Sequence, residues 1–466
     1  MTHRRFNRKH TVWLTGVFQA IVFAAAACSE SAPAAAPDPT AEVPTTQSPA
    51  PTATNAPGVA DTPAPTAPSV AAVAETPEPN TATPEPTANP LPLAPDADPV
   101  TLDGTPKLKD TGNWINTEPF TLAEQRELGN VVLIDFWTYT CVNCTHTLPF
   151  LREWHSKYSD RGLTILGVHT SEFEFEKITD NVQDAVTEFD IRYPIVQDND
   201  FGTWNEFENR FWPAKYLIDL QGEVRYNHFG EGGYDETELQ MRALLTEAGH
   251  DVSDIPANSD PGPQLDTAVD SSLGLNETTR ELYAGYERNI GALRSQSTPY
   301  VRHVEYYENL DVEVDYIDPG DHENHFLYLE GFWRNGPESL LHARETSDYD
   351  DYIGIKFYGT SVNAVMEPAD GMPLQVKVTL GEAPAGSDES GADIQYDPDG
   401  NSFIEVGTSR MYFVLNRDDF GGGELRLSSN SPEFSLFVFT FGAYEGGEPN
   451  PNPTASIGGG YDAGKN

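Results

Sequence analysis

The sequence predicts an α/β domain with a mixed sheet and flanking helices, followed by an all-β antiparallel domain of the sandwich or jelly-roll type. Two observations predict this order. Between about residues 100 and 249, apolar runs of strand length alternate with segments of helical spacing, which is typical of a sheet covered by helices. Between about residues 270 and 444, short alternating runs follow one another with Gly, Asn and Asp turns, which is typical of antiparallel sandwiches.

The N-terminus has the pattern of an export signal. Basic residues precede an apolar stretch over 12–27, which is shorter than the roughly 20 residues of a spanning helix. We therefore expect residues 1–28 to be a signal peptide. The three alanines before Cys28 resemble the lipobox of bacterial lipoproteins, which implies that Cys28 carries lipid and anchors the protein stably. The alternative is an ordinary signal peptide whose cysteine carries no lipid.

Residues 29–99 are rich in Ala, Pro and Thr and show no periodic apolar pattern. Such a composition buries too little apolar surface to fold, so we expect a disordered stalk. At about 3.1 Å per residue, a Pro-rich stalk of this length reaches up to roughly 200 Å. Residues 250–269 read as a linker and 445–466 as a flexible tail. Two predicted domains remain, at 100–249 and 270–444.

The chain is strongly acidic. Its 73 Asp and Glu residues against 28 Lys and Arg give a formal net charge of −45. This excess opposes binding to nucleic acid or to an anionic lipid surface, so we exclude nucleic acid as a partner. A saline habitat and simple solubility outside the cytoplasm both fit the charge.

The elements of the first domain follow in order. The apolar run 131–137 predicts a buried strand, and the apolar spacing from Leu148 to Tyr158 predicts a helix that ends near residue 160. A second buried strand is expected over 163–168. The remaining elements expected are helices over 181–189 and 203–211, an extended segment over 193–196, and a hairpin formed by 214–220 and 224–229.

Cys141 and Cys144 lie between the first predicted strand and the first predicted helix, and the only other cysteine is Cys28. A thiolate is the attacking species in disulfide exchange, and the start of a helix lowers the pKa of a thiol. We therefore expect Cys141 to be the nucleophile. Cys144, one helical turn later, is expected to be less exposed and to resolve the mixed disulfide.

A zinc site and a purely structural bridge are the alternatives for this pair. Zinc needs two more ligands at recognisable spacing, and His146, two residues after the motif, supplies no such spacing. A disulfide across two residues closes too small a loop to add much stability. We therefore expect a redox-active Cys141–Cys144 pair, with no metal and no separate cofactor.

Several features together resemble the thioredoxin fold: the segment 135–137, the CxxC motif, Pro149, and the pair Trp212 and Pro213 before a strand. The resemblance implies that Asp135 is a buried acid that exchanges a proton with the resolving cysteine; a solvent-facing carboxylate is the alternative. It also implies that Pro213 follows a cis bond and that Trp212 offers backbone hydrogen bonds to an extended substrate.

Longer stretches, over 137–141, 167–173 and 211–219, resemble the C-terminal region of the DipZ family more narrowly. There the domain is often fused to a membrane electron carrier of the cytochrome-biogenesis type. This sequence shows no such multi-span segment, so we expect a separate membrane protein to donate electrons. His169 and Glu172 fall just past a predicted strand, at the edge where open sheets place their sites. We therefore expect that either residue can tune the pKa of the thiolate. The alternative is that both are ordinary polar surface residues of a loop.

The second domain is predicted from six apolar alternating runs, at 326–329, 352–357, 374–378, 410–415, 424–427 and 435–441. Residues 279–291 read as a helix or as a loop that packs on the sheet. The runs 279–286 and 437–442 resemble the C-terminal module of DipZ proteins, which looks like a carbohydrate-binding jelly roll. Aromatic residues near its loops are candidates for stacking on sugars, with ordinary packing as the alternative: Trp333, Tyr349 and Tyr352.

Together these patterns predict an exported thiol-disulfide oxidoreductase, anchored at the outer face of the cytoplasmic membrane or in the cell wall or periplasm. We expect it to reduce protein or small-molecule disulfides, with the second domain placing it near cell-wall glycans or protein partners. An oxidant, with a potential nearer about −120 mV than about −270 mV, is the first alternative. A glycan-binding surface protein on a thioredoxin-like scaffold is the second.

Overall fold

A computed structural model describes residues 105–257, 278–444 and 446–447. These residues belong to one compact unit that spans Pro86–Asn466. The predicted signal peptide with Cys28, the stalk, most of the linker and most of the tail lie outside the described residues. No helix in the described ranges is long and apolar enough to cross a membrane.

The first sheet has six strands in the order β1-β4-β3-β2-β5-β6. Strand β2 pairs in parallel with β3 and antiparallel with β5, which makes the sheet mixed. The strands are β1 (Trp114–Ile115), β2 (Val131–Trp137), β3 (Leu163–His169), β4 (Ile195–Gln197), β5 (Ala214–Ile218) and β6 (Val224–Phe229).

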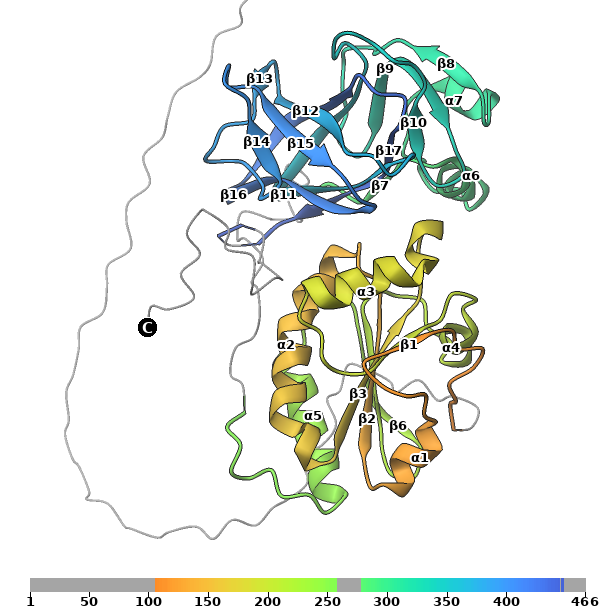
Figure 1. The fold of residues 1–466 in the computed structure, drawn as a ribbon, viewed down its shortest axis with the longest axis vertical. Coiled ribbons are helices and arrows are strands. Elements are labelled where there is room, and N and C mark those ends of the chain that lie inside the picture. The colour runs from red at the N-terminus through yellow and green to blue at the C-terminus, as the bar shows by residue number, and fades with distance from the viewer. Residues whose placement is uncertain (1–104, 258–277, 445, 448–466) are drawn as a thin grey trace, which may run out of the picture. The chain divides into compact units, whose positions relative to one another are not determined.

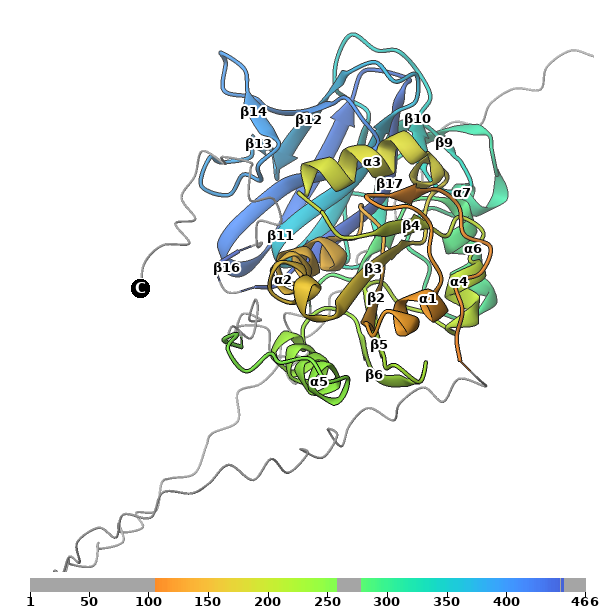
Figure 2. The ribbon, with the colours of Figure 1, turned by 60° about the horizontal axis from the view of Figure 1, so that its bottom comes forward.

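Helices cover both faces of this sheet, α2 and α5 on one face, α1 and α4 on the other (Figures 1 and 2). The α-helices of this first region are α1 (Leu122–Glu127), α2 (Val142–Tyr158), α3 (Thr179–Glu188), α4 (Gly202–Glu206) and α5 (Tyr234–Glu247). Alternate residues of β2 enter two different cores, because successive side chains of a strand point to opposite faces. Val131, Leu133 and Trp137 pack towards α2, whereas Val132, Ile134 and Phe136 pack on the other face.

The second sheet is antiparallel and has eleven strands, with β14-β15-β12-β16-β11-β17-β10-β9-β8 as its main path. Its longest strands are bent at register shifts, and β11 pairs with β17 at its C-terminal half and with β9 at its N-terminal half. Because β17 and β9 are also joined through β10, the sheet closes on itself around an apolar core. This arrangement confirms the predicted antiparallel β domain.

The elements of this second part begin with a short strand and two helices, which are β7 (Leu282–Tyr283), α6 (Tyr286–Arg294) and α7 (Val304–Glu308). The other strands are β8 (Glu313–Tyr316), β9 (Leu327–Asn335), β10 (Leu340–His342), β11 (Tyr352–Pro368), β12 (Leu374–Leu380), β13 (Ala383–Pro384), β14 (Ile394–Tyr396), β15 (Ser402–Val406), β16 (Arg410–Ser429) and β17 (Phe434–Gly442).

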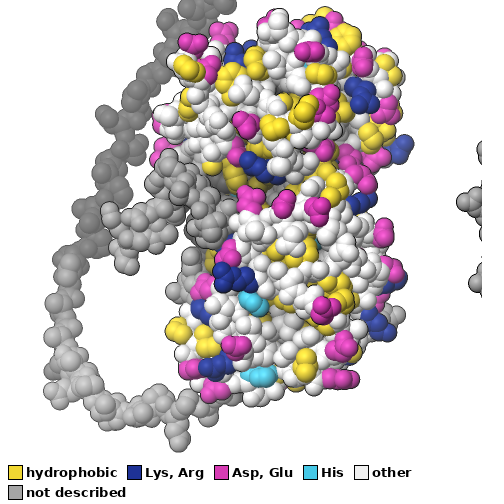
Figure 3. Space-filling model, viewed as in Figure 1, with side chains coloured by type: hydrophobic (Ala, Val, Ile, Leu, Met, Phe, Trp, Pro, Cys, Tyr) yellow, Lys and Arg dark blue, Asp and Glu magenta, His cyan; other side chains and the backbone are white. Residues whose placement is uncertain are grey.

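Acidic side chains are spread over the face seen in Figure 3, in keeping with the formal net charge of −45. Charged residues of both signs are interspersed on that face.

Candidate active site

Cys141 is the N-cap of helix α2 and follows the C-terminal end of β2. Its backbone is extended, and its Sγ accepts a hydrogen bond from the backbone N–H of Cys144 at 3.3 Å. Cys141 is half-buried, while Cys144 is 1% exposed. Both thiols are free. The predicted difference in exposure between the two thiols is therefore present in the fold.

The electrostatics around Cys141 differ from the expectation. We predicted that the helix start would lower its pKa, but burial raises that pKa, and the like charges of Glu281 and Glu172 add to the increase. The hydrogen bonds from Cys144 act in the opposite direction. The expected lowering is not found because the desolvation of the thiolate outweighs the hydrogen bonds that Cys144 donates to it. Burial also raises the pKa of Cys144, and neighbouring Cys141 and Asp135 raise it further.

Asp135 is a buried acid at 1% exposure and points to the face of the sheet that carries α2. Its Oδ1 atom has no hydrogen-bond partner within the described residues. Burial raises its pKa from 3.8 to about 7, and the positive charge of Lys215 on the neighbouring strand opposes that rise. The carboxyl group can therefore gain and lose a proton near neutral pH, as a proton-exchanging residue beside Cys144 requires.

Glu172 follows β3, and its side chain is 11% exposed. Its Oε1 accepts hydrogen bonds from the hydroxyl of Tyr283 at 2.9 Å and from the guanidinium of Arg288 at 2.7 Å. Burial raises its pKa to about 7 although Arg288 lowers it. Glu172 is thus a titratable neighbour of Cys141 whose negative charge disfavours the thiolate.

His169 is the last residue of β3 and is fully buried. Its ring stacks on Tyr139 at 5.7 Å between centroids, and its Nε2 lies 3.3 Å from the hydroxyl of Thr138. Burial lowers the pKa of His169 to about 3, so the ring is neutral at physiological pH. His169 therefore supports the loop before Cys141 by packing, and does not tune the thiolate through a charge.

The peptide bond between Trp212 and Pro213 is cis, as the resemblance implied. The indole N–H of Trp212 donates to the carbonyl oxygen of Thr170 at 3.1 Å, and its ring packs on Trp204 with centroids 4.3 Å apart. Trp212 is half-buried and Pro213 is buried. These contacts tie the segment before β5 to the loop after β3.

Sequence reasoning missed Glu176, a fully buried residue in the short 3₁₀ helix after β3, Glu174–Lys177. Its Oε1 accepts a hydrogen bond from the hydroxyl of Thr140 at 2.5 Å, and its Oε2 accepts from the backbone N–H of Phe173 at 3.0 Å. Thr140 directly precedes Cys141. Glu176 therefore fixes the approach to the CxxC motif, and its charged neighbours Glu174 and Lys177 gave no sequence signal of its burial.

Of the three aromatic residues proposed to contact glycans, Trp333 cannot do so because it is not exposed to solvent. It is fully buried in β9, and its indole N–H donates to the carbonyl oxygen of Glu330 at 2.8 Å. Alternate residues of β9 point inward, and position 333 falls on the inner face. Tyr349 and Tyr352 are half-buried. The hydroxyl of Tyr352 donates a hydrogen bond to the carboxylate of Asp318, and Tyr349 packs on Phe403.

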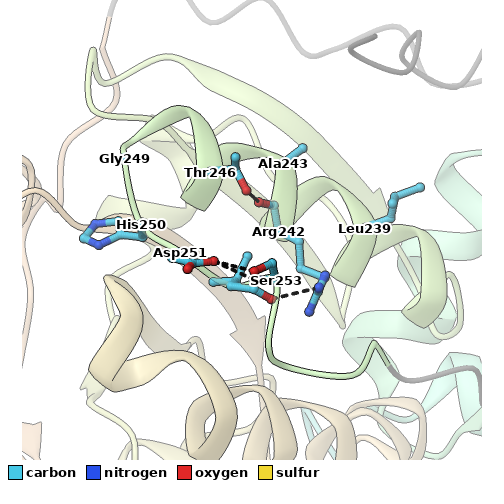
Figure 4. A pocket seen from close by; sticks show the side chains of 9 residues that line it. Leu239, Arg242, Ala243, Thr246, Gly249, His250, Asp251 and Ser253 are labelled. Atoms are coloured by element: carbon cyan, nitrogen blue, oxygen red, sulfur yellow. Dashed lines mark hydrogen bonds between the residues drawn. The ribbon is translucent and has the colours of Figure 1, made fainter. Parts of the chain in front are cut away.

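A surface pocket of about 490 Å³ lies at the C-terminal end of α5, away from the CxxC motif (Figure 4). Arg242 lines it and donates hydrogen bonds to the carbonyl oxygens of Val252 and Ile255 at 3.0 and 2.8 Å. Asp251 accepts from the hydroxyl of Ser253 at 2.7 Å. These hydrogen bonds hold the segment that follows α5 against the helix. None of the predicted site residues lines this pocket.

Two family models match parts of the chain. A model described as "AhpC/TSA family" matches residues 105–227, and one described as "Thioredoxin like C-terminal domain" matches residues 279–442. The protein DipZ of Mycobacterium tuberculosis is 44% identical over 163 residues, which are 34% of this chain and 23% of DipZ. The chain thus spans about a quarter of the length of that relative.

Two further relatives match about a third of the chain each. NHL repeat-containing protein 2 of Homo sapiens is 37% identical over 141 residues, or 30% of this chain and 19% of that protein. Thiol-disulfide oxidoreductase YkuV of Bacillus subtilis is 30% identical over 142 residues, which are 30% of this chain and 94% of YkuV. Because nearly all of YkuV is matched and the CxxC pair sits at the start of α2, the chain belongs to the thioredoxin-like thiol-disulfide oxidoreductases.

Proposed function

We propose that this oxidoreductase acts as a disulfide reductase with Cys141 as nucleophile and Cys144 as resolving thiol. The Cys141 thiolate attacks a substrate disulfide, forms a mixed disulfide and releases the first substrate thiol. Cys144 then gives its proton to Asp135, and its thiolate attacks Sγ of Cys141. The Cys141–Cys144 disulfide forms, the second substrate thiol leaves, and two electrons have passed to the substrate.

The observation that carries this direction is the environment of Cys141. Strong oxidants of this fold stabilise their reduced form through a thiolate with a pKa as low as about 3.5. Here burial, together with the charges of Glu281 and Glu172, raises the pKa of Cys141. An unstabilised thiolate leaves the reduced dithiol ready to give up its electrons, which supports a reductase over an oxidant.

We further propose that the chain works outside the cytoplasm, anchored through a lipid on Cys28, and that a separate membrane protein of the cytochrome-biogenesis type reduces its disulfide again. The export pattern before Cys28 and the 44% identity to DipZ over 163 residues support this proposal. A role near cell-wall glycans rests on the resemblance of the second domain to a carbohydrate-binding module. Among the named aromatics, Tyr349 and Tyr352 are the ones partly exposed.

Trapping the mixed disulfide tests the assigned order of the two thiols. The Cys144→Ala variant, mixed with a disulfide-bonded peptide, is expected to accumulate a covalent adduct that reductant releases and mass spectrometry places on Cys141. The Cys141→Ala variant is expected to form none. An adduct on Cys144 in the Cys141→Ala variant, at a rate like that of the first adduct, would overturn the assignment.

A further inference from the structure

The ends of four strands meet at the edge of the first sheet that carries the CxxC motif. The register pairs Trp137 at the end of β2 with His169 at the end of β3. On the other side it pairs Phe136 with Ala214 at the start of β5, and Ala214 with Phe229 at the end of β6. The segments that follow β2, β3 and β6, and the segment that precedes β5, therefore lie around the two thiols.

The second domain, which contains the eleven-stranded sheet, is tied to the segments that follow β2 and β3. After β2, the hydroxyl of Tyr139 donates a hydrogen bond to the carbonyl oxygen of Ser409 at 3.4 Å. After β3, the carboxylate of Glu172 accepts hydrogen bonds from Tyr283 and Arg288 of the second domain. Two of the four segments around the thiols are thus held against that domain.

Apolar packing and a further hydrogen bond extend this contact. The ring centroids of Phe173 and Phe175 lie 5.2 and 4.9 Å from that of Phe437 on β17, and all three residues belong to one apolar core. After β6, the carboxylate of Glu231 accepts a hydrogen bond from the hydroxyl of Tyr444 at 2.6 Å. The second domain is therefore joined to three of the four segments that surround the thiols.

The segment before β5 has no such tie to the second domain among the described residues. The ring contacts of Trp212 are with Phe201 and Trp204 of its own domain, and its indole N–H also donates within that domain. Next to it, Phe211 is 51% exposed. The half-buried Cys141 can therefore be reached along this segment.

This enclosure limits the size of a substrate. In disulfide exchange, the attacking thiolate must reach one sulfur atom of the substrate directly to form the mixed disulfide. A small molecule or an extended chain can bring a sulfur atom to Cys141 along the one segment that the second domain leaves uncovered. A folded protein presents its disulfide on a broad surface, so it would first have to displace that domain. The displacement breaks hydrogen bonds to carboxylates and exposes the Phe437 contact, and both changes cost free energy.

We propose that the second domain is a fixed wall of the thiol site, which admits the disulfides of small molecules and extended chains to Cys141 and excludes the disulfides of folded proteins. The inference rests on the proposed function and names its substrate class. The chemistry is unchanged: two electrons pass from the Cys141–Cys144 dithiol to the substrate disulfide, which leaves as two thiols while the Cys141–Cys144 disulfide forms.

Two glutathione mixed disulfides of matched sequence test the proposal on the reduced full chain. One is on a single introduced surface cysteine of folded ubiquitin, and the other is on a short peptide that copies the residues around that cysteine. Mass spectrometry follows the loss of glutathione from each. We expect the peptide to react about 100-fold faster or more, because the folded substrate must first break the hydrogen bonds that hold the second domain. Dithiothreitol, which has no such wall, should reduce both at similar rates.

Variants at the contact assign the difference in rate to the second domain. Arg288→Gln with Tyr444→Phe removes two of the ties, and Phe437→Ala added to them weakens the apolar packing. Both variants should bring the two rates closer, the triple variant by about tenfold or more. The matched control is Arg302→Gln with Tyr352→Phe, which removes an exposed ion pair and a hydroxyl–carboxylate hydrogen bond inside the second domain. It should keep the ratio of the unaltered protein.

The ratio of the two rates isolates access, since a change in the pKa of the Cys141 thiol alters both rates alike. Equal rates in the unaltered protein, after correction by the dithiothreitol rates, overturn the proposal whether or not the variants fold. An unchanged ratio in the folded triple variant overturns the role of the second domain. A chain that reduces neither substrate would instead refute the proposed function itself.

Discussion

Replacing Asp135 by Asn should make the folded protein more stable, and the gain should grow with pH. Asp135 is 1% exposed, and its pKa rises from 3.8 to about 7 on folding, mainly because of burial. A carboxyl group whose pKa is raised in the folded state supports folding fully below its unfolded value. That support is lost as the pH rises through the folded value.

The magnitude follows from the two pKa values. A difference of about 3 units corresponds to about 4 kcal/mol of unfolding free energy between the two limits of pH. About 1 kcal/mol of this is already lost at pH 4.5, because Asp in the unfolded chain is then largely ionised. Asp135→Asn should therefore gain about 3 kcal/mol more stability at pH 8 than at pH 4.5. The cost of burying the new amide is the same at both values and cancels in this difference.

Urea unfolding of the reduced protein, followed by tryptophan fluorescence, measures this gain. Most of the described tryptophans lie in the first sheet region, so the signal reports mainly that region: Trp114, Trp137, Trp154, Trp204 and Trp212. Asp160→Asn, at an exposed carboxylate after α2, is the control and should change little at either pH. An equal effect of Asp135→Asn at pH 4.5 and pH 8 would refute the assigned environment of this residue.

Three further predictions concern residues around the site and in the second core. Glu172→Gln removes a like charge near Cys141, so alkylation of Cys141 at pH 7.5 should become several-fold faster. Glu174→Gln, at an exposed side chain two residues later, should leave the alkylation rate unchanged. Equal alkylation rates in Glu172→Gln and the unaltered protein would contradict the effect of Glu172 on Cys141. Glu176→Gln should lower the urea-unfolding free energy by about 1–3 kcal/mol, because the amide nitrogen of Gln cannot accept one of the buried hydrogen bonds that Thr140 and Phe173 now donate, and a neutral effect would count against its role. Trp333→Ala should lower the unfolding free energy of the second sheet region by about 3–5 kcal/mol, because the ring is fully buried. A loss of unfolding free energy below about 1 kcal/mol would argue for an exposed ring.

The sequence patterns predicted most of the sheet strands because their signals are local. The run 131–137 became β2, with every residue buried. The helix predicted over 203–211 is shorter, since α4 ends at Glu206 and Glu208 takes a left-handed φ of 50° that stops the helix. Helix α5 was missed because its apolar residues are sparse among acidic ones, and residues 279–291 contain a short strand before a helix.

Only those parts of the site that local sequence motifs encode were predicted. The CxxC pair and the buried acid are visible as motifs, but the raised pKa of Cys141 depends on what covers it in the fold. Lys215 carried a readable signal, a lysine inside the apolar strand 214–218, as Asp135 is an acid inside 131–137. Their direct pairing, however, is a matter of strand order and register, which no local pattern contains.

The equilibrium reduction potential of the Cys141–Cys144 pair tests the proposed direction of electron flow most directly. It is measured on the full chain in glutathione or dithiothreitol buffers, by trapping free thiols and separating the reduced from the oxidised protein. A reductase with an unstabilised Cys141 thiolate should give a value near or below about −230 mV. A value near about −120 mV would contradict that direction and identify an oxidant.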